Sequence, residues 1–446
     1  MKLHRTAALA AGITLVASAL AACSSSSDSG GGHTVNWWTW DDKQAAAYKS
    51  CIAPFEKANP GTTVKITQYN VVDYFTKLTA GFVGGGAPDA FQNSVPGLDS
   101  YAKQHQLEPM DSYIKQNNFT MSRYSVGVSA WQYTDGKQYG LPLDWASSAI
   151  YYNKDLLAKA GYTEADVANL TFNPQDGGTF GKMVAHLTVD SHGVRGDQPG
   201  FDKNHVSVYG LISQESKDYI GQTTWNAFAS ALGWRLGDKP NWPTQFNYTD
   251  PRFVQTVEYM KSLSDKGFAP KLNQFTTSDV EQLGSKHIAM ATGGSWEATT
   301  FAKLPGIKVG IAPTVKGPDG KRAVLSNPNG NNIWAGSKNK DAAWKWISFM
   351  GTEQCQTLAS ATGTFFPSIP ASFNAMVTTL KKQGIDLSVF QGQMADGDLY
   401  TAPAYANGLA ISDEIQPMFE AYFGGSKGPD VFAQMASKAK DLLNKS

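Results

Sequence analysis

The sequence has little charge, few histidines and only three cysteines. Charged residues make up 17% of the chain, and 38 basic residues balance 38 acidic ones. Nucleic-acid binding is therefore not expected, because it needs a cluster of Lys and Arg to meet the phosphates, and no basic stripe is present. The seven His residues are scattered, and none is paired at the spacing of metal ligands. We expect no metal site and no cofactor.

The motifs that mark common enzymes are also missing. There is no G-x-S-x-G elbow, no H-E-x-x-H helix and no Walker loop. A glycosidase needs two carboxylates that flank one bond, roughly 5–9.5 Å apart. Asp41, Asp144 and Glu297 could be imagined in that role. No other feature supports a glycosidase, and we expect a protein that makes or breaks no covalent bond.

No apolar run is long enough for a permanent membrane span, which needs ~20 residues. The apolar stretch 6–19 follows a basic start and is typical of a signal-peptide core. It closes with Leu20-Ala21-Ala22-Cys23, which resembles a bacterial lipobox. Residues 1–22 are thus predicted to be a lipoprotein signal peptide, and residues 23–33, rich in Ser and Gly, a flexible tether. The alternative is an ordinary signal peptide with an incidental Cys.

What the chain does contain is an unusual number of aromatic residues. There are 12 Trp, and aromatics make up 12% of the sequence. Trp and Tyr offer broad apolar surface at a low cost in conformational entropy. A neutral, aromatic-rich chain suggests an uncharged partner with flat apolar faces.

The most informative stretch is 139–157, YGLPLDWASSAIYYNKDLL. Residues 149–152 are prone to form a strand. Asn153 then predicts a helix start, because its side chain can accept hydrogen bonds from free N–H groups of the first turn. The pair Asp144-Trp145 precedes the strand and is expected at its mouth.

The pattern GLPxDxxxxAIYYNKDLLxKAG in this stretch resembles the family 1 extracellular solute-binding proteins, the sugar-binding subunits of ABC importers related to maltose-binding protein. Residues 59–66, the ALGWRLGD turn and the helix in 337–350 resemble further segments of that family. Together the matches cover nearly the whole mature chain. Two segments depart from the family pattern: 165–178 lacks the usual helix start, and 190–204 is an unusual insertion.

The resemblance implies an α/β fold of the periplasmic-binding-protein type II, with two α/β lobes and a ligand cleft between them. The strand-helix alternation at the start of the chain independently favours a parallel α/β layer. The expected division is 34–142 in lobe 1, 143–300 in lobe 2, 301–352 back in lobe 1, and 353–446 in lobe 2. The crossings are expected near Leu143, Phe301 and 351–363, with the strand at 307–312 in lobe 1. The family fold would also place Cys51 and Cys355 on helices of one lobe, where they could form a disulfide; two separate buried thiols are the alternative.

Ligands of open α/β sheets sit beyond the carboxyl ends of the strands, so we collected the polar and aromatic residues after or near the predicted strand ends. Phe366 is included because of its likeness to the family, and Trp225 because a ligand contact and a core position are equally expected for it. The candidate ligand-binding residues are Trp40, Asp41, Asn93, Ser94, Asp144, Trp145, Tyr209, Trp225, Gly294, Ser295, Trp296, Trp334 and Phe366.

Indole faces match the C–H faces of a sugar ring, and carboxylate, amide and hydroxyl groups match its hydroxyls. Each candidate has a structural alternative: Asp144 can cap a turn, and the aromatics can belong to the core. We predict capture of a carbohydrate, most simply a di- or oligosaccharide, by lobe closure, and delivery to ABC permease subunits. Lipid on Cys23 would anchor the protein to the outer face of the membrane. A peptide- or polyol-binding protein is the alternative, and a surface glycosidase a weaker one.

Overall fold

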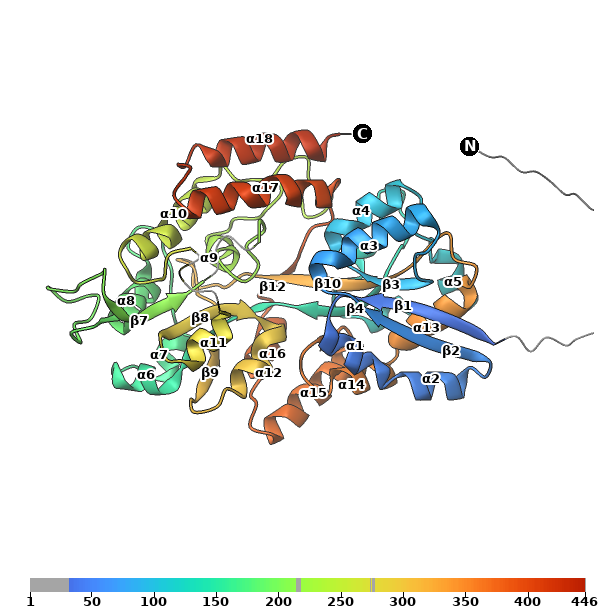
Figure 1. Cartoon of the computed structure of the whole chain (residues 1–446), viewed down its shortest axis with the longest axis horizontal. Helices are drawn as coiled ribbons and strands as arrows, with labels where there is room; N and C mark the ends of the chain where they lie inside the picture. The colour runs from blue at the N-terminus through green and yellow to red at the C-terminus, as the bar shows by residue number, and fades with distance from the viewer. Residues whose placement is uncertain (1–31, 214–217, 273, 275–276, 446) are drawn as a thin grey trace, which may run out of the picture.

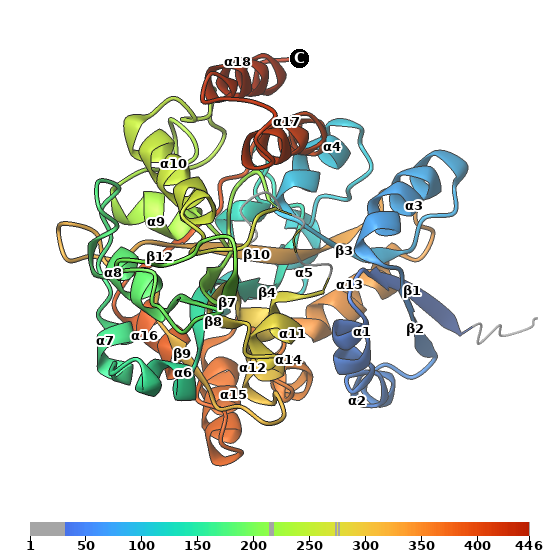
Figure 2. The same ribbon diagram turned by 60° about the vertical axis from the view of Figure 1, so that its left-hand side comes forward.

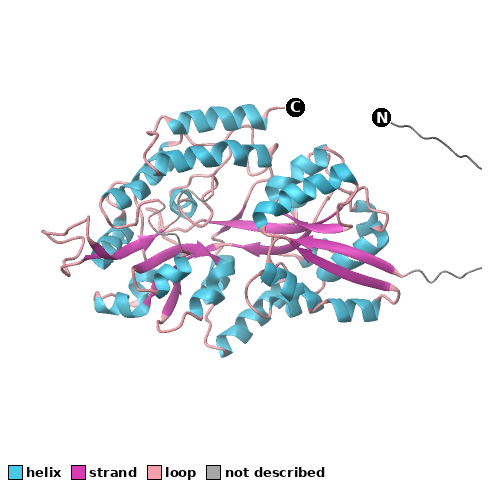
Figure 3. Cartoon of the chain, in the orientation of Figure 1, coloured by secondary structure: helices cyan, strands magenta, loops and turns pink. Residues whose placement is uncertain are grey.

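The computed structural model describes residues 32–445 except 214–217, 273 and 275–276. Two β-sheets lie side by side, and each is covered by helices, so that the molecule has two lobes (Figure 1). Figure 3 shows the strands as a central band with helices above and below it. The two-lobed α/β architecture predicted from the sequence is confirmed.

The first sheet has the order β11-β4-β10-β3-β1-β2, with β12 beside β10. Its strands are β1 (His33–Thr39), β2 (Thr62–Gln68), β3 (Ala90–Asn93), β4 (Leu141–Ala146), β10 (Val324–Ile333), β11 (Phe366–Pro367) and β12 (Leu399–Thr401). Strands β2, β1 and β3 are parallel, as the strand-helix alternation predicts, whereas β10 runs antiparallel to β3 and β4. The carboxyl ends of β1 and β3 therefore lie at the same edge as the start of β10.

Lobe 1 forms around this sheet, and its core holds Trp37, Phe55 and Trp346. Its helices are α1 (Asp42–Lys49), α2 (Ile52–Ala58), α3 (Val71–Gly84), α4 (Val95–Lys103), α5 (Asp111–Gln116), α13 (Lys340–Met350), α14 (Glu353–Ser360) and the short turns η1 (Met121–Arg123) and η2 (Ser129–Trp131). A disulfide joins Cys51 to Cys355 and so fastens α14 to the α1–α2 junction. The bridge that the resemblance implied is present.

The second sheet has the order β6-β7-β8-β5-β9. Its strands are β5 (Ser148–Asn153), β6 (Val189–Asp190), β7 (Val206–Ile212), β8 (Ile288–Gly294) and β9 (Val309–Ala312). The helices of lobe 2 are α6 (Lys154–Lys159), α7 (Glu164–Ala168), α8 (Gly178–Leu187), α9 (Asn226–Ala231), α10 (Pro251–Asp265), α11 (Asp279–Gly284), η3 (Ser295–Glu297), α12 (Ala298–Ala302), α16 (Ser388–Ala395), α17 (Gly408–Phe423) and α18 (Val431–Leu443). The helix α15 (Pro370–Lys382) packs against α14 and β11 of lobe 1. Asn153 caps α6 by accepting from the N–H groups of Asp155 and Leu156, as predicted.

Two boundaries of the lobes differ from the sequence-based expectation. The strand at 307–312 was expected in lobe 1, but β9 pairs with β5 along its length and forms an edge of the second sheet. Lys316 and Arg322 still bond to residues 168–172 of lobe 2, and the chain returns to the lobe 1 sheet with β10. Residues 353–360 were expected in lobe 2, but α14 is held in lobe 1 by the disulfide, and the following β11 still pairs with β4.

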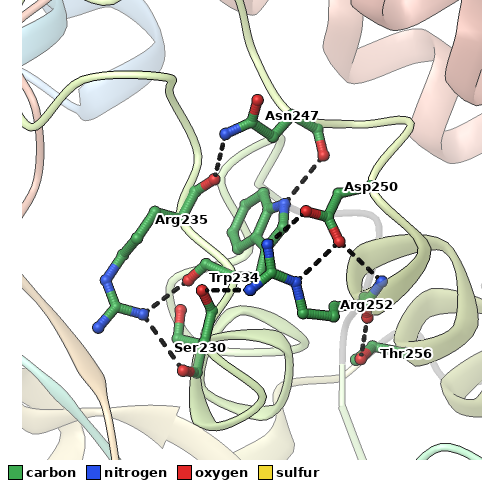
Figure 4. A network of polar contacts seen from close by, with 8 residues as sticks. Ser230, Trp234, Arg235, Asn247, Asp250, Arg252 and Thr256 are labelled. Carbon is green, nitrogen blue, oxygen red and sulfur yellow. Dashed lines mark hydrogen bonds and ion pairs between the residues drawn. The ribbon is translucent and has the colours of Figure 1, made fainter.

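A polar network secures the start of α10 in lobe 2 (Figure 4). Asp250 caps the helix, and the Arg252 side chain returns to Asp250 and also donates to the carbonyl of Gly233 at 2.9 Å. Trp234 donates from its indole N–H to the carbonyl of Asn247 at 2.9 Å. The ALGWRLGD segment therefore ties α9 to α10, and its role is structural.

The lobes touch on two sides of their junction. The Nζ of Lys43 on α1 donates to Oγ1 of Thr300 on α12 at 3.2 Å. On the other side, the N–H of Asn407, just before α17, donates to a carboxylate oxygen of Asp99 on α4 at 2.7 Å. Figure 2 shows β10 and β12 at the junction between these contacts. None of the helices in the described part of the chain is both long and apolar enough to cross a membrane.

Candidate functional site

The candidate site is the interlobe cleft, where strand ends of the two sheets face each other. The carboxyl ends of β1 and β3 come from lobe 1, and the carboxyl end of β8 comes from lobe 2. The bond between Lys43 and Thr300 shows that α1, which follows β1, meets α12, which follows β8. Such a crevice beyond strand ends is where open α/β sheets bind ligands.

Lobe 1 brings an indole and a carboxylate to the cleft directly after β1. Trp40 is partly exposed, with its ring edge-on to Tyr74 at 5.3 Å between centroids. Asp41 caps α1 by accepting from the N–H of Gln44 at 2.8 Å. Burial raises the pKa of Asp41 above its usual value. Both residues directly follow β1, and their contact with a ligand stays a prediction.

After β3, Asn93 and Ser94 have different positions. Asn93 is fully buried, and its Oδ1 accepts from the N–H of Ser94 at 2.9 Å, so it supports the turn from below. Ser94 is partly exposed and lines a cavity between the lobes. Ser94 is therefore placed to contact a ligand, whereas Asn93 is placed to hold Ser94.

Lobe 2 contributes Gly294, Ser295 and Trp296 after β8. The Trp296 ring lies so close over Gly294 that a Cβ there would be 2.4 Å from ring atoms, which explains the glycine. Trp296 is partly exposed, in contrast to most tryptophans of the described chain. Ser295 is buried and exchanges bonds with Ser147, where the chain crosses between the lobes. These contacts fix the base on which the Trp296 ring stands.

A cavity of about 180 Å³, called the front cavity here, lies between the lobes. Its polar lining comes from Ser94 and Asn327 of lobe 1 and from Asp218, Gln222 and Asn226 of lobe 2. Gln222 is only 6% exposed, and its Nε2 has no hydrogen-bond partner among the described residues. Each carboxylate oxygen of Asp218 accepts one backbone N–H, and burial raises the pKa of this group. The lining thus offers a free amide donor close to a carboxylate acceptor.

Asp144 was predicted to bind the ligand, and the structure gives it a different position. It is 2% exposed. Its two oxygens accept from Gln44 Nε2 and, at 2.7 Å, from Asn329 Nδ2. Burial, opposed by the Asn329 bond and reinforced by the charge of Asp41, raises the pKa of Asp144 to about 7. Asp144 is therefore a positioning group that orients Gln44 at the start of α1.

Three predicted aromatic contacts lie in the core instead. Trp145 is 1% exposed, donates to the carbonyl of Pro367 and packs against Phe366 and Phe373. Phe366 is fully buried in the same cluster. Trp225 is also fully buried, with its ring stacked on Phe419 at 5.5 Å. Protein side chains cover the faces of each ring, so no ring face is free to stack on a sugar.

Two further predicted residues lie away from the edge of the sheet that faces the cleft. Tyr209 pairs with Ile288 at the start of β8, whereas the cleft is at the end of β8. Trp334 follows β10, which is antiparallel to β3, so it lies at the amino end of β3 and packs near Phe82. The same reversal brings the start of β10, with Asn327 and Asn329, to the cleft.

The residues that sequence reasoning missed have identifiable signals. Asp218 and Gln222 follow the predicted strand 207–212 and satisfy the strand-end rule better than Tyr209, which is inside that strand. Asn327 and Asn329 carried no signal, because strand direction cannot be read from local sequence. Among the described residues, no group of three or more His, Cys, Asp or Glu could hold a metal ion.

Residues 50–384 match the family model of bacterial extracellular solute-binding proteins. The chain belongs to this family, whose members are binding receptors and not enzymes. It is accordingly a solute-binding protein of an ABC transporter.

Relatives and solved structures agree with this assignment. The chain is 24% identical over 399 residues to a putative binding protein of Brucella abortus, covering 88% of each chain. It is 25% identical to a maltooligosaccharide ABC transporter solute-binding lipoprotein of Streptococcus pneumoniae, covering 74% of this chain and 71% of the relative. The fold resembles that of a Listeria monocytogenes substrate-binding protein solved with cycloalternan, with a TM-score of 0.76 at 21% identity, covering 93% of this chain and all of the other.

Proposed function

We propose that this protein captures a neutral carbohydrate, a di- or oligosaccharide, between its lobes and delivers it to ABC permease subunits. The observation that carries the proposal is the front cavity, whose lining includes the carboxylate of Asp218 and Gln222, whose Nε2 has no partner among the described residues. A sugar hydroxyl both donates and accepts, so a pair of hydroxyls satisfies both groups. Among the described residues, no Lys or Arg lines the cavity, and this disfavours an anionic ligand.

The front cavity alone is too small to enclose a whole di- or oligosaccharide. Pockets that enclose a drug-sized ligand measure about 300–1,000 Å³, and the front cavity is smaller, at about 180 Å³. We infer that it takes one end of the ligand, while the rest lies in the cleft between Trp40 and Trp296. The relative from Streptococcus pneumoniae and the Listeria complex both concern oligosaccharides.

Ligand capture is coupled to the angle between the lobes. A ligand that contacts Ser94 on one side and Gln222 on the other binds the closed form better than the open form, so it shifts the population toward closure. No covalent step is involved. The closed form is then the species that the permease receives.

A thermal-shift screen tests this proposal. We expect oligosaccharides to raise the unfolding midpoint, because a ligand that binds only the folded state stabilises it. The substitution Gln222→Glu should lower the affinity for the sugar identified by the screen about tenfold. It removes the free donor, retains the acceptor for Asn327 and adds a charge near Asp218. The exposed Gln383→Glu in the same lobe is the control. Preference for a peptide or a simple polyol, or equal affinity in both variants, would overturn the carbohydrate site.

We also propose that lipid on Cys23 anchors the protein to the outer face of the membrane. Cys23 and the signal peptide lie outside the described residues, so this proposal depends on the sequence Leu20-Ala21-Ala22-Cys23 and on the Ser/Gly tether. Stable anchoring needs at least two acyl chains, which a diacylglyceryl group supplies. The substitution Cys23→Ala should move the protein from the membrane fraction to the soluble fraction. Equal membrane retention of the two forms would contradict the anchor.

A further inference from the structure

A second cavity lies on the opposite side of the strands that join the lobes. This rear groove measures about 530 Å³ and is lined by residues 124–129, Gln132, Gln138, Ser326 and the segment around Leu399. It shares no lining residue with the front cavity. Its size falls within the range of about 300–1,000 Å³ that is common for small-molecule sites.

The alternation of side chains along β10 separates the two cavities. Leu325 and Asn327 line the front cavity, and Ser326 between them lines the rear groove. Successive side chains of a strand point to opposite faces. β12 repeats the pattern, because Leu399 and Thr401 line the rear groove, whereas Tyr400 between them donates to Asn226 of the front cavity. The ribbon of β10 and β12 is thus a common wall with one cavity on each face.

The floor of the rear groove presents a hydroxyl that the protein leaves unsatisfied. Ser326 is 1% exposed, and its Oγ has no partner among the described residues. A buried polar group without a partner is costly, and each case in a native fold needs an explanation. Ser326 pairs with Thr401 on β12, so a second hydroxyl stands next to it on the same face.

The walls of the groove are polar but uncharged. Ser125 and Ser129 supply hydroxyls, and Gln138 supplies an amide that is held by bonds to the carbonyls of Val128 and Gly140. Val126 and Leu399 supply apolar surface. The described lining contains no Asp, Glu, Lys, Arg or His. A charged ligand would find no counter-charge here, whereas a neutral molecule with several hydroxyls would find partners for both its hydroxyls and its C–H groups.

We propose that the rear groove is a second binding site, for a small neutral polyol of about the size of a hexitol. One side of the groove is formed by residues 124–129, Gln132 and Gln138 and the other by Met394 on α16, and Val126 and Met394 pack against the same hydrophobic cluster. The ribbon of β10 and β12 lies between this groove and the front cavity. The proposal does not depend on which solute the front cavity binds.

The test uses sorbitol as the probe, with saturation-transfer NMR and calorimetric titration of the whole mature protein. Ser129 is exposed at the groove, so Ser129→Trp fills the site without disturbing the core and should abolish sorbitol binding. Ser326→Ala removes the hydroxyl at the floor of the groove and should lower the affinity for sorbitol at least threefold. The matched control is Ser122→Trp, an exposed position on η1 that does not line the groove.

A cleft variant, Trp296→Ala, separates the two sites. Sorbitol bound in the rear groove should be retained in this variant and in Ser122→Trp. Three results would overturn the proposal: no binding of sorbitol by the native chain, unchanged binding in Ser129→Trp, or a loss of binding in Trp296→Ala equal to that in Ser129→Trp. The third result would assign the polyol to the interlobe cleft.

Discussion

Replacement of Trp296 by alanine should weaken binding of the sugar ten- to hundredfold while the fold stays intact. An aromatic contact is worth about 0.5–1.5 kcal/mol beyond the apolar area that it buries, and a tenfold change in affinity corresponds to about 1.4 kcal/mol. Trp296 is partly exposed and lies over Gly294 at the end of β8. Its loss should therefore remove a ligand surface and little of the core.

Calorimetric titration of the sugar identified by the screen measures this effect, and the thermal midpoint of the free protein reports on the fold. Trp334→Ala is the matched control, because Trp334 is also partly exposed but lies at the amino end of β3, away from the cleft. An unchanged dissociation constant in Trp296→Ala, with a normal midpoint, would remove Trp296 from the site. An equal loss in Trp334→Ala would show that the effect is not local.

The elements that local chemistry determines were predictable. Asn153 caps α6 and Asp250 caps α10, each followed by residues with the expected helical pattern. The strand-helix alternation at the start of the chain correctly predicted the parallel strands β2, β1 and β3. The strand-end rule also selected Ser94, which lines the front cavity, while the roles of Trp40 and Trp296 stay predictions. In each case the signal lies within a few residues of the feature.

The errors have a common physical cause, which is that burial and strand direction are tertiary properties. The local sequences around Trp145 and Trp296 do not distinguish a buried ring from an exposed one. Phe366 and Phe373 cover the Trp145 ring, whereas the Trp296 ring is partly exposed. Those two phenylalanines are more than 200 positions away in the sequence. β10 could be predicted as a strand but not as an antiparallel one, so Trp334 was expected in the cleft and Asn329 was overlooked.

The strand-end rule was also applied too narrowly in lobe 2. Tyr209 was chosen because it is aromatic, although it lies inside β7. The polar residues after that strand, Asp218 and Gln222, reach the front cavity. The aromatic-rich composition favoured Tyr209 as a ligand contact, whereas position after the strand end favoured the carboxylate of Asp218 and the amide of Gln222. In this fold, position was the better guide.

Stability of the native protein should fall as the pH rises from about 4 to about 7, and Asp144→Asn should remove most of that fall. Burial raises the pKa of Asp144 from the ordinary value of 3.8 to about 7. Between these two values the folded state binds a proton that the unfolded state has released, so the free energy of unfolding decreases with rising pH. A shift of this size corresponds to about 4 kcal/mol between the two limits. Below pH 4 both states are protonated, and above pH 7 both are ionised.

Urea unfolding at intervals between pH 4 and pH 8 measures the slope, with the exposed Asp319→Asn as the control that should leave it unchanged. Asp144→Asn should unfold at higher urea than the native protein at pH 8, because an amide carries no buried charge and its oxygen still accepts from one of the two N–H donors, Gln44 Nε2 and Asn329 Nδ2. The pKa values of Asp41 and Asp218 are also raised, so a shallower slope in the same direction should persist in the variant. A slope equal to that of the native protein would show that Asp144 does not titrate in this range. Because Asp144 orients Gln44 at the start of α1, its ionisation acts on the same helix end that presents Trp40 and Asp41 to the cleft.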